Sequence, residues 1–240
     1  MLAVMADVHG NLAALKAVLA DAERVGANEL VCLGDVASFG PQPRETLRRV
    51  QSLGCPVVMG NADWELLDAP TLETLKAPDM TSFDIASWCA EQLTEEDKAF
   101  IRTFQKTVRL ELDGLPILCF HGSPNSYNDE IVATTSDETL TEFFEERAPL
   151  MFGGHTHTQL LRRYQDLMFI NPGSVGLPFE LLVDGSARNP AWAEYALLEV
   201  VQGQPSVTFR RVPYDVQPLL EAAKTSGMPH AEMWSADWSG

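Results

Sequence analysis

The chain has 240 residues, of which 45% are hydrophobic, and this size suits one large domain or one domain with an insertion. A chain of this composition can bury a sizeable core, which excludes wholesale disorder. The 17 Lys and Arg residues against 34 Asp and Glu residues give a net charge of −17, which argues against non-specific binding to nucleic acid or to anionic membranes.

Four cysteines are present, and none of them forms a C-x-x-C pair. Cys32 and Cys119 lie inside apolar runs, which predicts buried free thiols and a reducing compartment. The first residues, MLAVMADVHGN, have no basic stretch, and their apolar run is too short for a signal peptide or a membrane span. We therefore expect a soluble, cytoplasmic protein without a membrane partner, whose oligomeric state the sequence leaves open.

The first quarter of the chain alternates short apolar runs with amphipathic patterns. These predict strands at 1–7, 29–35 and 55–61, with helices between them at 11–26 and 43–54. Asn11 is placed to cap the start of the first helix. This β-α-β-α-β order predicts a parallel sheet with right-handed crossovers.

The rhythm breaks at residues 65–107, which we interpret as a small helical insertion within a single domain covering residues 1–240. Thr94 and Asp97 form a capping-box signature in its clearest helix. The second half predicts a second sheet packed on the first, with strands at 108–112, 116–122, 148–155, 158–164, 167–173, 194–201 and 206–212. Residues 225–240 hold two Trp and no clear period, which favours a loosely ordered tail or one that packs against a partner.

Residues with metal-binding side chains collect directly after the apolar runs. In open α/β sheets, ligands bind beyond the carboxyl ends of the strands, so we expect these side chains to converge at one edge. They comprise two carboxylates, four imidazoles and one amide. The set is Asp7, His9, Asp35, Asn61, His121, His155 and His157. His230 lies in the polar tail, and we interpret it as a surface residue.

The spacing within this set favours a metal site. Asp7 and His9 are two residues apart, as are His155 and His157, and in extended backbone such pairs point to the same side. Mixed nitrogen and oxygen donors suit divalent ions such as Mn, Fe, Ni or Zn, and the lack of a thiolate makes a closed structural zinc site the weaker hypothesis. Each motif alone has an ordinary explanation, since Asp7 and His9 could merely cap a helix, but five such segments in this order favour the metal site.

The motifs D-x-H-G at 7–10, G-D at 34–35, G-N-x-D at 60–63, H-G at 121–122 and G-H-T-H at 154–157 resemble, in this order, those of the calcineurin-like metallophosphoesterase superfamily. The stretches DVHGNLAALKAVL and INPGSVGLP are similar to its small bacterial and archaeal phosphodiesterase branch. The resemblance covers about residues 1–212. It implies an α/β fold, a four-layer α/β/β/α sandwich of two mixed β-sheets, with the helical insertion added to it.

The resemblance also implies a binuclear metal centre that hydrolyses phosphate esters by in-line attack of a metal-bridging hydroxide. Carried over by position, one metal takes Asp7, His9, Asp35 and His157, and the other takes Asp35, Asn61, His121 and His155. Asp35 would bridge the two ions. Asp35, Asn61 and His121 are the residues we expect to be catalytic.

Ala62 departs from the family pattern. Many members have a His at this position, which is thought to protonate the leaving oxygen or to steady the transition state. General acid catalysis is typically worth about a hundred- to ten-thousand-fold, so its loss predicts a bias toward phosphodiesters or activated esters with stable leaving groups. The sequence leaves open what Asp63 does without its usual partner.

Two loops are candidates for the substrate site. Gly173 and Ser174 lie in INPGSVG, which could form a backbone N–H nest for an anion or, as an equal alternative, a tight turn between strands. Asn125 and Tyr127 follow His121 and are candidate pocket residues, although ordinary loop polarity explains them as well.

The leading functional hypothesis is a metal-dependent phosphodiesterase or phosphatase whose substrate is a small-molecule or nucleotide phosphate ester. A protein phosphatase or a dinucleoside polyphosphate hydrolase would use the same chemistry. A non-catalytic scaffold with the same fold is the alternative of another class, and the complete ligand set disfavours it. The sequence determines neither the native metals nor the physiological substrate.

Overall fold

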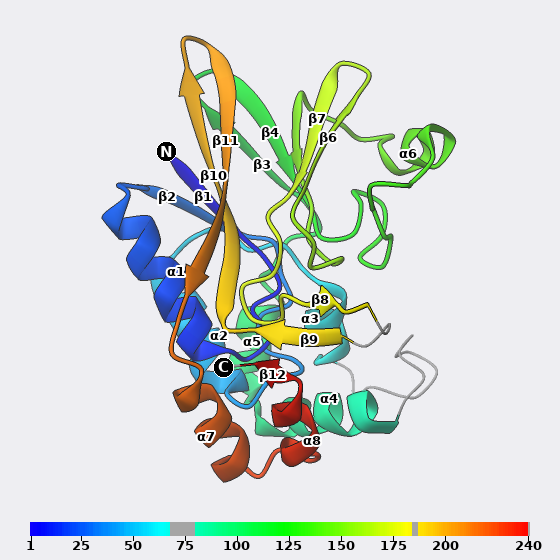
Figure 1. Cartoon of the computed structure of the whole chain (residues 1–240). Coiled ribbons are helices and arrows are strands. Elements are labelled where there is room, and N and C mark those ends of the chain that lie inside the picture. Colours follow the sequence, from blue (N-terminus) through cyan, green and yellow to red (C-terminus); the bar gives the residue numbers. More distant parts are fainter. Residues whose placement is uncertain (68–79, 184–186, 240) are drawn as a thin grey trace.

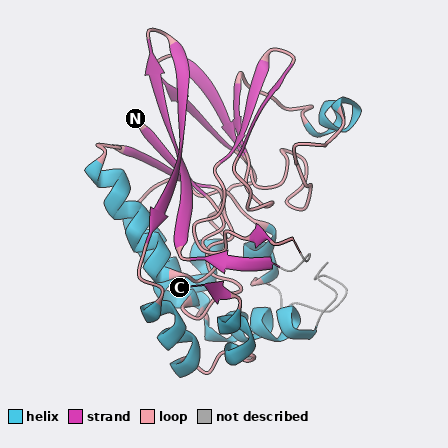
Figure 2. Ribbon diagram, viewed as in Figure 1, coloured by secondary structure: helices cyan, strands magenta, loops and turns pink. Residues whose placement is uncertain are grey.

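The structure is a computed structural model of the chain and describes residues 1–67, 80–183 and 187–239. Two mixed β-sheets form its centre (Figures 1 and 2). The four-stranded sheet has the order β11 (Gln204–Pro213), β10 (Trp192–Val201), β1 (Leu2–Met5) and β2 (Glu29–Cys32). The five-stranded sheet has the order β3 (Val108–Leu112), β4 (Leu115–Cys119), β5 (Leu150–Phe152), β7 (Leu167–Asn171) and β6 (Leu160–Tyr164).

Helices pack on the outer faces of these sheets and on one another. They are α1 (Leu12–Arg24), α2 (Pro43–Leu53), α3 (Asn61–Glu65), α4 (Met80–Gln92), α5 (Glu95–Ile101), α6 (Asp137–Phe143), α7 (Gln217–Thr225) and α8 (Ala231–Ala236). A small third sheet has the order β12 (Trp238–Ser239), β9 (Ala187–Pro190) and β8 (Glu180–Leu181). The predicted strands of the second half are present, whereas the sequence analysis did not anticipate α6, α7 or the third sheet.

The alternation of side chains along β1 explains the layers. Leu2 and Val4 pack in a cluster with side chains of the five-stranded sheet, while Ala3 and Met5 pack on the opposite face with those of the helices. Successive side chains of a strand point to opposite faces, so an apolar run buried on both faces joins two layers. On the far side of the five-stranded sheet, Leu140 of α6 packs in a third cluster. The result is the predicted α/β/β/α sandwich.

Local sequence signals explain several element boundaries. Asn11 accepts a hydrogen bond from the Ala14 N–H and caps α1, and Thr94 and Asp97 form the predicted capping box of α5. The predicted strand at 55–61 is reduced to isolated bridges from Val57 and Val58. Pro56 has no N–H to donate to a ladder, and the chain leaves the sheet at residue 60 to begin α3.

The C-terminal residues pack on the chain itself. The sequence analysis offered loose order or a partner as interpretations of this tail. In the structure, the buried indoles of Trp234 and Trp238 are 5.4 Å apart between ring centroids. They belong to the apolar cluster between the four-stranded sheet and the helices. His230 lies at the surface, as expected, and its Nε2 is 2.7 Å from Asp84 Oδ2 on α4. The tail therefore lies against α4.

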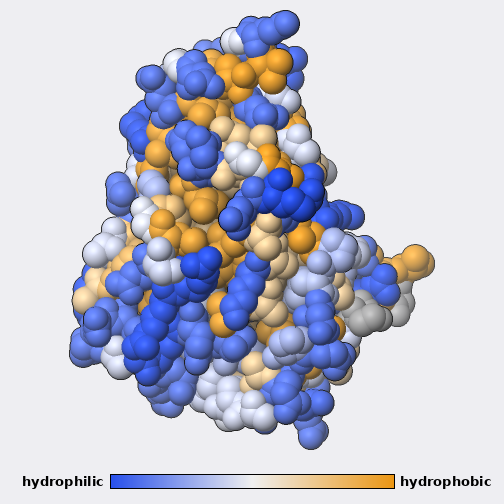
Figure 3. Space-filling model, turned by 90° about the vertical axis from the view of Figure 1, so that its left-hand side faces the viewer, coloured by the Kyte–Doolittle hydropathy of each residue, from blue (hydrophilic) through white to orange (hydrophobic). Residues whose placement is uncertain are grey.

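The surface matches the composition. On the face shown in Figure 3, hydrophilic residues cover most of the lower part, where helices lie, and apolar residues appear between charged ones over the strands above. Cys32 and Cys119 are buried free thiols, as predicted. Among the described residues, no helix combines the length and the apolar character needed to cross a membrane.

Candidate metal centre

The seven residues singled out in the sequence converge where strands of both sheets end. Asp7 and His9 follow β1, Asp35 follows β2, His121 follows β4, and the G-H-T-H segment follows β5. Asn61 is the first residue of α3. Two groups of possible ligands have donor atoms within 4.8 Å of one another: Asp7, His9 and His157 in one, and Asp35, His121 and His155 in the other.

The backbone at this centre differs from the extended form expected from the i, i+2 spacing. Positive φ angles between 47° and 70° occur at Asp7, His9, Asp35, His155 and His157. Residues other than glycine seldom adopt this region, and such outliers gather at functional sites where the surrounding structure holds them. His155 and His157 enter different groups, whereas Asp7 and His9 share one.

Three imidazoles are oriented through their Nδ1 atoms. Nδ1 of His9 lies 3.2 Å from the Ser38 carbonyl oxygen, and Nδ1 of His157 lies 2.8 Å from that of Leu177. Nδ1 of His121 is 2.8 Å from the Leu33 carbonyl oxygen. A carbonyl oxygen only accepts, so each Nδ1 carries the proton and donates it. Nε2 is then the atom that each ring directs at the centre, as in metal-ligating histidines.

The contact between His9 and His157 shows whether this set of side chains suits a bound cation. Their Nε2 atoms are 3.0 Å apart. Burial lowers the pKa of His9, and burial together with the proximity of His9 lowers the pKa of His157 to about 3, so both rings are neutral near pH 7. Two neutral rings that donate through Nδ1 present lone pairs to each other. A bound cation resolves this repulsion, and the donor set therefore fits a metal ion.

The two carboxylates lie between the histidines. Asp35 Oδ2 is 3.3 Å from His121 Nε2 and 3.8 Å from His9 Nε2, so it reaches residues of both groups. Asp7 Oδ1 is 3.5 Å from His157 Nε2 and 3.9 Å from His121 Nε2. Asn61 Oδ1 lies 3.0 Å from His121 Nε2, beside the second group.

The buried carboxylates of the centre favour the binding of cations. Burial, with a further contribution from Asp35, raises the pKa of Asp7 to about 8. Burial also acts to raise the pKa of Asp35, but the adjacent His121 and His9 hold it below its usual range. Although burial opposes it, Asp35 and Asp7 raise the pKa of His121 to about 10. The two buried carboxylates thus depend on the positive charge of nearby imidazoles, and divalent cations would supply more of it.

Asp63 holds the loop that carries Asp35. Its Oδ2 accepts hydrogen bonds from the N–H groups of Asp35 at 2.6 Å and Gly60 at 3.3 Å, and its Oδ1 accepts one from Val36 at 2.8 Å. The buried Ala62 takes part through its backbone, because its N–H donates to Asp35 Oδ1 at 2.9 Å. Asp63 therefore has a positioning role that does not need a histidine at position 62.

The four candidate substrate residues lie in different settings. The Asn125 amide points toward α6, with Nδ2 3.5 Å from the Glu142 carbonyl oxygen. The Tyr127 ring lies 6.1 Å from that of Trp64, on the short helix that Asn61 begins.

Gly173 and Ser174 are buried and form hydrogen bonds with residues at or near the metal centre. The Gly173 N–H donates to the Asn171 side chain, and the buried Ser174 hydroxyl donates to the Asp7 carbonyl oxygen at 2.8 Å. The N–H groups of Val175 and Gly176 also have backbone acceptors. This geometry favours the alternative that the sequence left open, a tight turn, over an anion-binding nest.

Two residues near the ligands, Asn171 and Glu65, were not predicted from the sequence. Asn171 Nδ2 donates to the Gly154 carbonyl oxygen at 2.7 Å and to Thr156 Oγ1 at 3.0 Å, which fixes the G-H-T-H segment. Glu65 lies four residues after Asn61 on α3, and burial with the charge of Asp35 raises its pKa to about 7. The i, i+4 spacing could have pointed to Glu65, but no sequence signal identifies the backbone carbonyls that orient the histidines.

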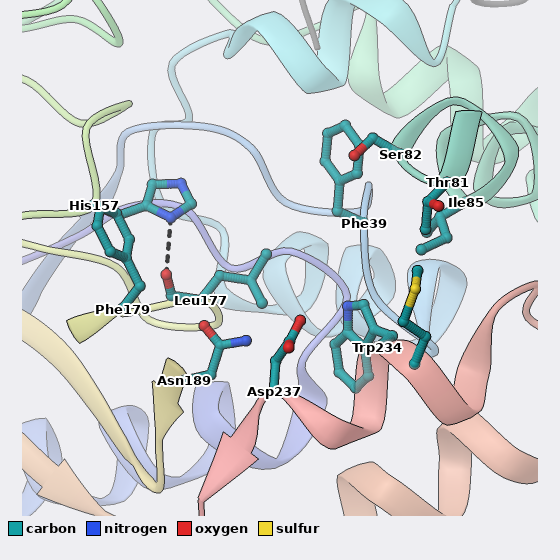
Figure 4. A pocket seen from close by; sticks show the side chains of 11 residues that line it. Phe39, Thr81, Ser82, Ile85, His157, Leu177, Phe179, Asn189, Trp234 and Asp237 are labelled. Carbon is teal, nitrogen blue, oxygen red and sulfur yellow. Dashed lines mark hydrogen bonds between the residues drawn. The ribbon is translucent and has the colours of Figure 1, made fainter. Parts of the chain in front are cut away.

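A pocket of about 580 Å³ adjoins the centre (Figure 4). His157 forms part of its wall, with Phe179 beside it and Phe39, Asn189 and Trp234 farther along. No local pattern in the sequence predicts this pocket, since its residues come from six separate segments.

The comparison with protein families agrees with this geometry. The family model of the calcineurin-like phosphoesterase superfamily domain matches residues 1–203. The chain therefore belongs to this superfamily, and it is a metal-dependent phosphoesterase.

Individual relatives extend the similarity over nearly the whole chain. The chain is 24% identical over 236 residues to the uncharacterized protein MJ0912 of Methanocaldococcus jannaschii, covering 95% of this chain and 94% of the relative. A metallophosphoesterase from Sphaerobacter thermophilus has 27% identity and a TM-score of 0.76, with 98% of both chains covered. The hypothetical protein PH1004 from Pyrococcus horikoshii OT3 shares the fold, with 21% identity, a TM-score of 0.79, and 96% of this chain and 95% of that chain covered.

Proposed function

We propose that this phosphoesterase is a phosphodiesterase that hydrolyses small-molecule or nucleotide phosphate diesters with two divalent cations bound. The observation that supports it most directly is the facing pair of His9 and His157 Nε2 atoms, 3.0 Å apart, with both Nδ1 atoms engaged elsewhere. One cation would be held by Asp7, His9, Asp35 and His157, and the other by Asp35, Asn61, His121 and His155. Nitrogen and oxygen donors without a thiolate suit Mn, Fe, Ni or Zn.

Asp35, Asn61 and His121 are the residues we propose to be catalytic, since they meet at the centre of the site. When bound, the cations would supply Lewis-acid stabilisation of the phosphoryl group and activation of water at neutral pH. The chain itself supplies orientation: the Leu33 carbonyl oxygen fixes His121, and Asp63 fixes the Asp35 backbone. Phosphoryl transfer depends mainly on such positioning and electrostatics, so no Ser or Cys nucleophile is needed.

Charge favours diesters over monoesters, and proton supply favours esters with stable leaving groups. A monoester carries nearly two negative charges at neutral pH and a diester carries one, which matters for a chain with a net charge of −17. Ala62 has no ionisable group, and general acid help of about 10²- to 10⁴-fold is therefore missing at that position. Esters whose leaving group needs no proton, such as aryl oxygens, would suffer least.

The test is a hydrolysis assay on the full chain loaded with Mn, comparing bis-p-nitrophenyl phosphate with p-nitrophenyl phosphate. Both release the same leaving group, so the comparison isolates the number of ester bonds. We expect a higher kcat/KM for the diester, and His155→Ala should abolish both activities. His230→Ala is the matched control, because this histidine lies at the surface on Asp84 and should leave the rate unchanged.

A higher kcat/KM for the monoester would overturn the diester preference. Protein that binds no metal and turns over neither ester would instead favour the non-catalytic scaffold.

A further inference from the structure

The wall of the pocket beside His157 contacts the metal centre through two pairs of aromatic rings. The Phe179 ring lies 6.4 Å from the His157 ring, and the Phe39 ring lies 5.8 Å from the His9 ring, edge-on. Both phenylalanines line the pocket. A group attached to a phosphate at the centre would therefore have these rings as its first neighbours.

The Phe39 backbone is held in an unfavourable conformation. Its φ is 65°, in the left-handed region that bulky residues seldom adopt. The next residue, Gly40, is pressed against the loop of the metal ligands, since a Cβ there would lie 1.9 Å from the His9 carbonyl oxygen. The contact fixes the Phe39 ring at the pocket relative to His9. Such strain persists where the surrounding structure imposes it, commonly at ligand sites.

Size and lining define the kind of group that fits. The volume of about 580 Å³ lies within the range of small-molecule sites, about 300–1,000 Å³, and exceeds what a phosphate alone requires. Phe39, Phe179 and Trp234 provide three aromatic side chains, and Figure 4 shows them around the cavity together with Leu177. Aromatic side chains are the usual platforms on which planar rings stack.

The polar residues of the pocket point to an uncharged ring with hydrogen-bond donors. Asn189 and Asp237 lie side by side at one end, and the Asn189 N–H donates to the Asp237 carbonyl oxygen at 2.7 Å (Figure 4). Among the described lining residues there is an Asp carboxylate but no Lys or Arg. A carboxylate accepts hydrogen bonds from ring or amino N–H groups and repels a further phosphate. These features match a nucleobase better than a polyphosphate chain.

Part of the pocket lies outside the family match. Met233, Trp234 and Asp237 line it, and all three come after residue 203, where that match ends. Thr81 and Ile85 of α4 complete the same side. The pocket therefore combines residues of α4, inside the family match, with residues of the C-terminal tail, beyond it.

We propose that this pocket binds the nucleoside of a nucleotide phosphate ester, with the base against Phe39, Phe179 and Trp234 and its donors toward Asp237. The inference rests on the proposed function, because the metal centre must hold the phosphate that the nucleoside carries.

The experiment is a calorimetric titration of the Mn-loaded full chain with inorganic phosphate, ribose 5-phosphate and adenosine 5′-monophosphate. The first probe reports the metal centre, the second adds the sugar, and the third adds the base. Stacking of one base corresponds to about 5- to 150-fold in affinity. We expect adenosine 5′-monophosphate to bind more tightly than ribose 5-phosphate by a factor in this range, and Phe179→Ala to remove about 5-fold or more of it.

Phe179 is 42% exposed, so its truncation does not empty the core, and Leu161→Ala, at 41% exposure on β6, is the matched control. Equal affinities for ribose 5-phosphate and adenosine 5′-monophosphate, with phosphate still binding, would refute the nucleoside pocket alone. An equal loss in both variants would refute it as well. If none of the probes binds in a metal-dependent way and bis-p-nitrophenyl phosphate is not hydrolysed, the proposed function fails and the pocket assignment with it.

Discussion

Replacing Gly60 by Ala is a sharp test of how the chain builds the centre. Gly60 has φ −91° and ψ 168°, a conformation open to any residue, so the substitution introduces no backbone strain. What it introduces is a Cβ that would lie 2.0 Å from Asp35 Oδ1 and 2.6 Å from the Asp35 nitrogen. Real Cβ contacts essentially never fall below 3.0 Å. The Asp35 carboxylate must therefore retreat by the difference, about 1 Å.

The displacement falls on the residue that reaches both groups of ligands. A misplacement of about 1 Å in an active site can lower the rate about 100-fold, which corresponds to about 2.7 kcal/mol of transition-state stabilisation. We expect Gly60→Ala to lower kcat/KM for bis-p-nitrophenyl phosphate by about this factor. The metal content after desalting, measured by mass spectrometry, should fall as well.

Gly203→Ala is the matched control. Gly203 has φ 75° and open space around its position, so alanine there adds strain without a contact, in the turn between β10 and β11. It should lower the free energy of unfolding by about 1 kcal/mol and leave metal binding intact. If Gly60→Ala retains the wild-type metal content and rate, the close approach of Gly60 to Asp35 does not matter for the site.

Two further predictions concern stability. Removal of metal by EDTA should lower the Tm of the wild-type chain, by an amount equivalent to about 2.7 kcal/mol at a cation concentration 100 times Kd, and His155→Ala should show a smaller shift in the same calorimetric scan. Asp21→Asn should cost about 3 kcal/mol in urea unfolding at pH 7, because buried Asp21 accepts two hydrogen bonds from Arg210, at 2.7 and 3.0 Å, and one from Tyr195 at 2.8 Å. Despite burial, these bonds hold the pKa of Asp21 below its usual value, so this stabilisation is present above about pH 4 and is lost as the pH falls through the folded-state pKa. A difference between wild type and Asp21→Asn that grows toward low pH would contradict this sign, and an EDTA shift of equal size in His155→Ala would contradict the first prediction.

Asp21 also illustrates what periodicity can and cannot reveal. The amphipathic pattern of the first helix predicts one apolar face, with Leu12, Leu15, Leu19 and Ala22. In the structure Leu15 and Ala22 are buried, whereas Leu12 and Leu19 are half-buried. The pattern cannot predict that Asp21 lies buried on the same helix, because its partners Tyr195 and Arg210 belong to β10 and β11, far along the chain. A buried carboxylate is decided by the charge that another segment brings to it.

The sequence by itself determined the elements whose causes are local. Caps, amphipathic periods and apolar runs act over a few residues, which is why the helix start at Asn11, the capping box at Thr94 and most strands could be predicted. The candidate ligands were identifiable for a similar reason: all except Asn61 follow a strand, and strand ends meet at one edge of a sheet.

Tertiary structure alone decided how the side chains of the candidate ligands are oriented and which residues surround them. The carbonyl oxygens of Ser38, Leu33 and Leu177 that direct the imidazoles come from separate loops. The pocket likewise depends on where α4 and the C-terminal tail pack, and such long-range packing leaves no periodic trace in the sequence. For a hydrolase of this superfamily, the local signals thus define the chemistry that is available, whereas the packing of distant segments decides which ester can reach it.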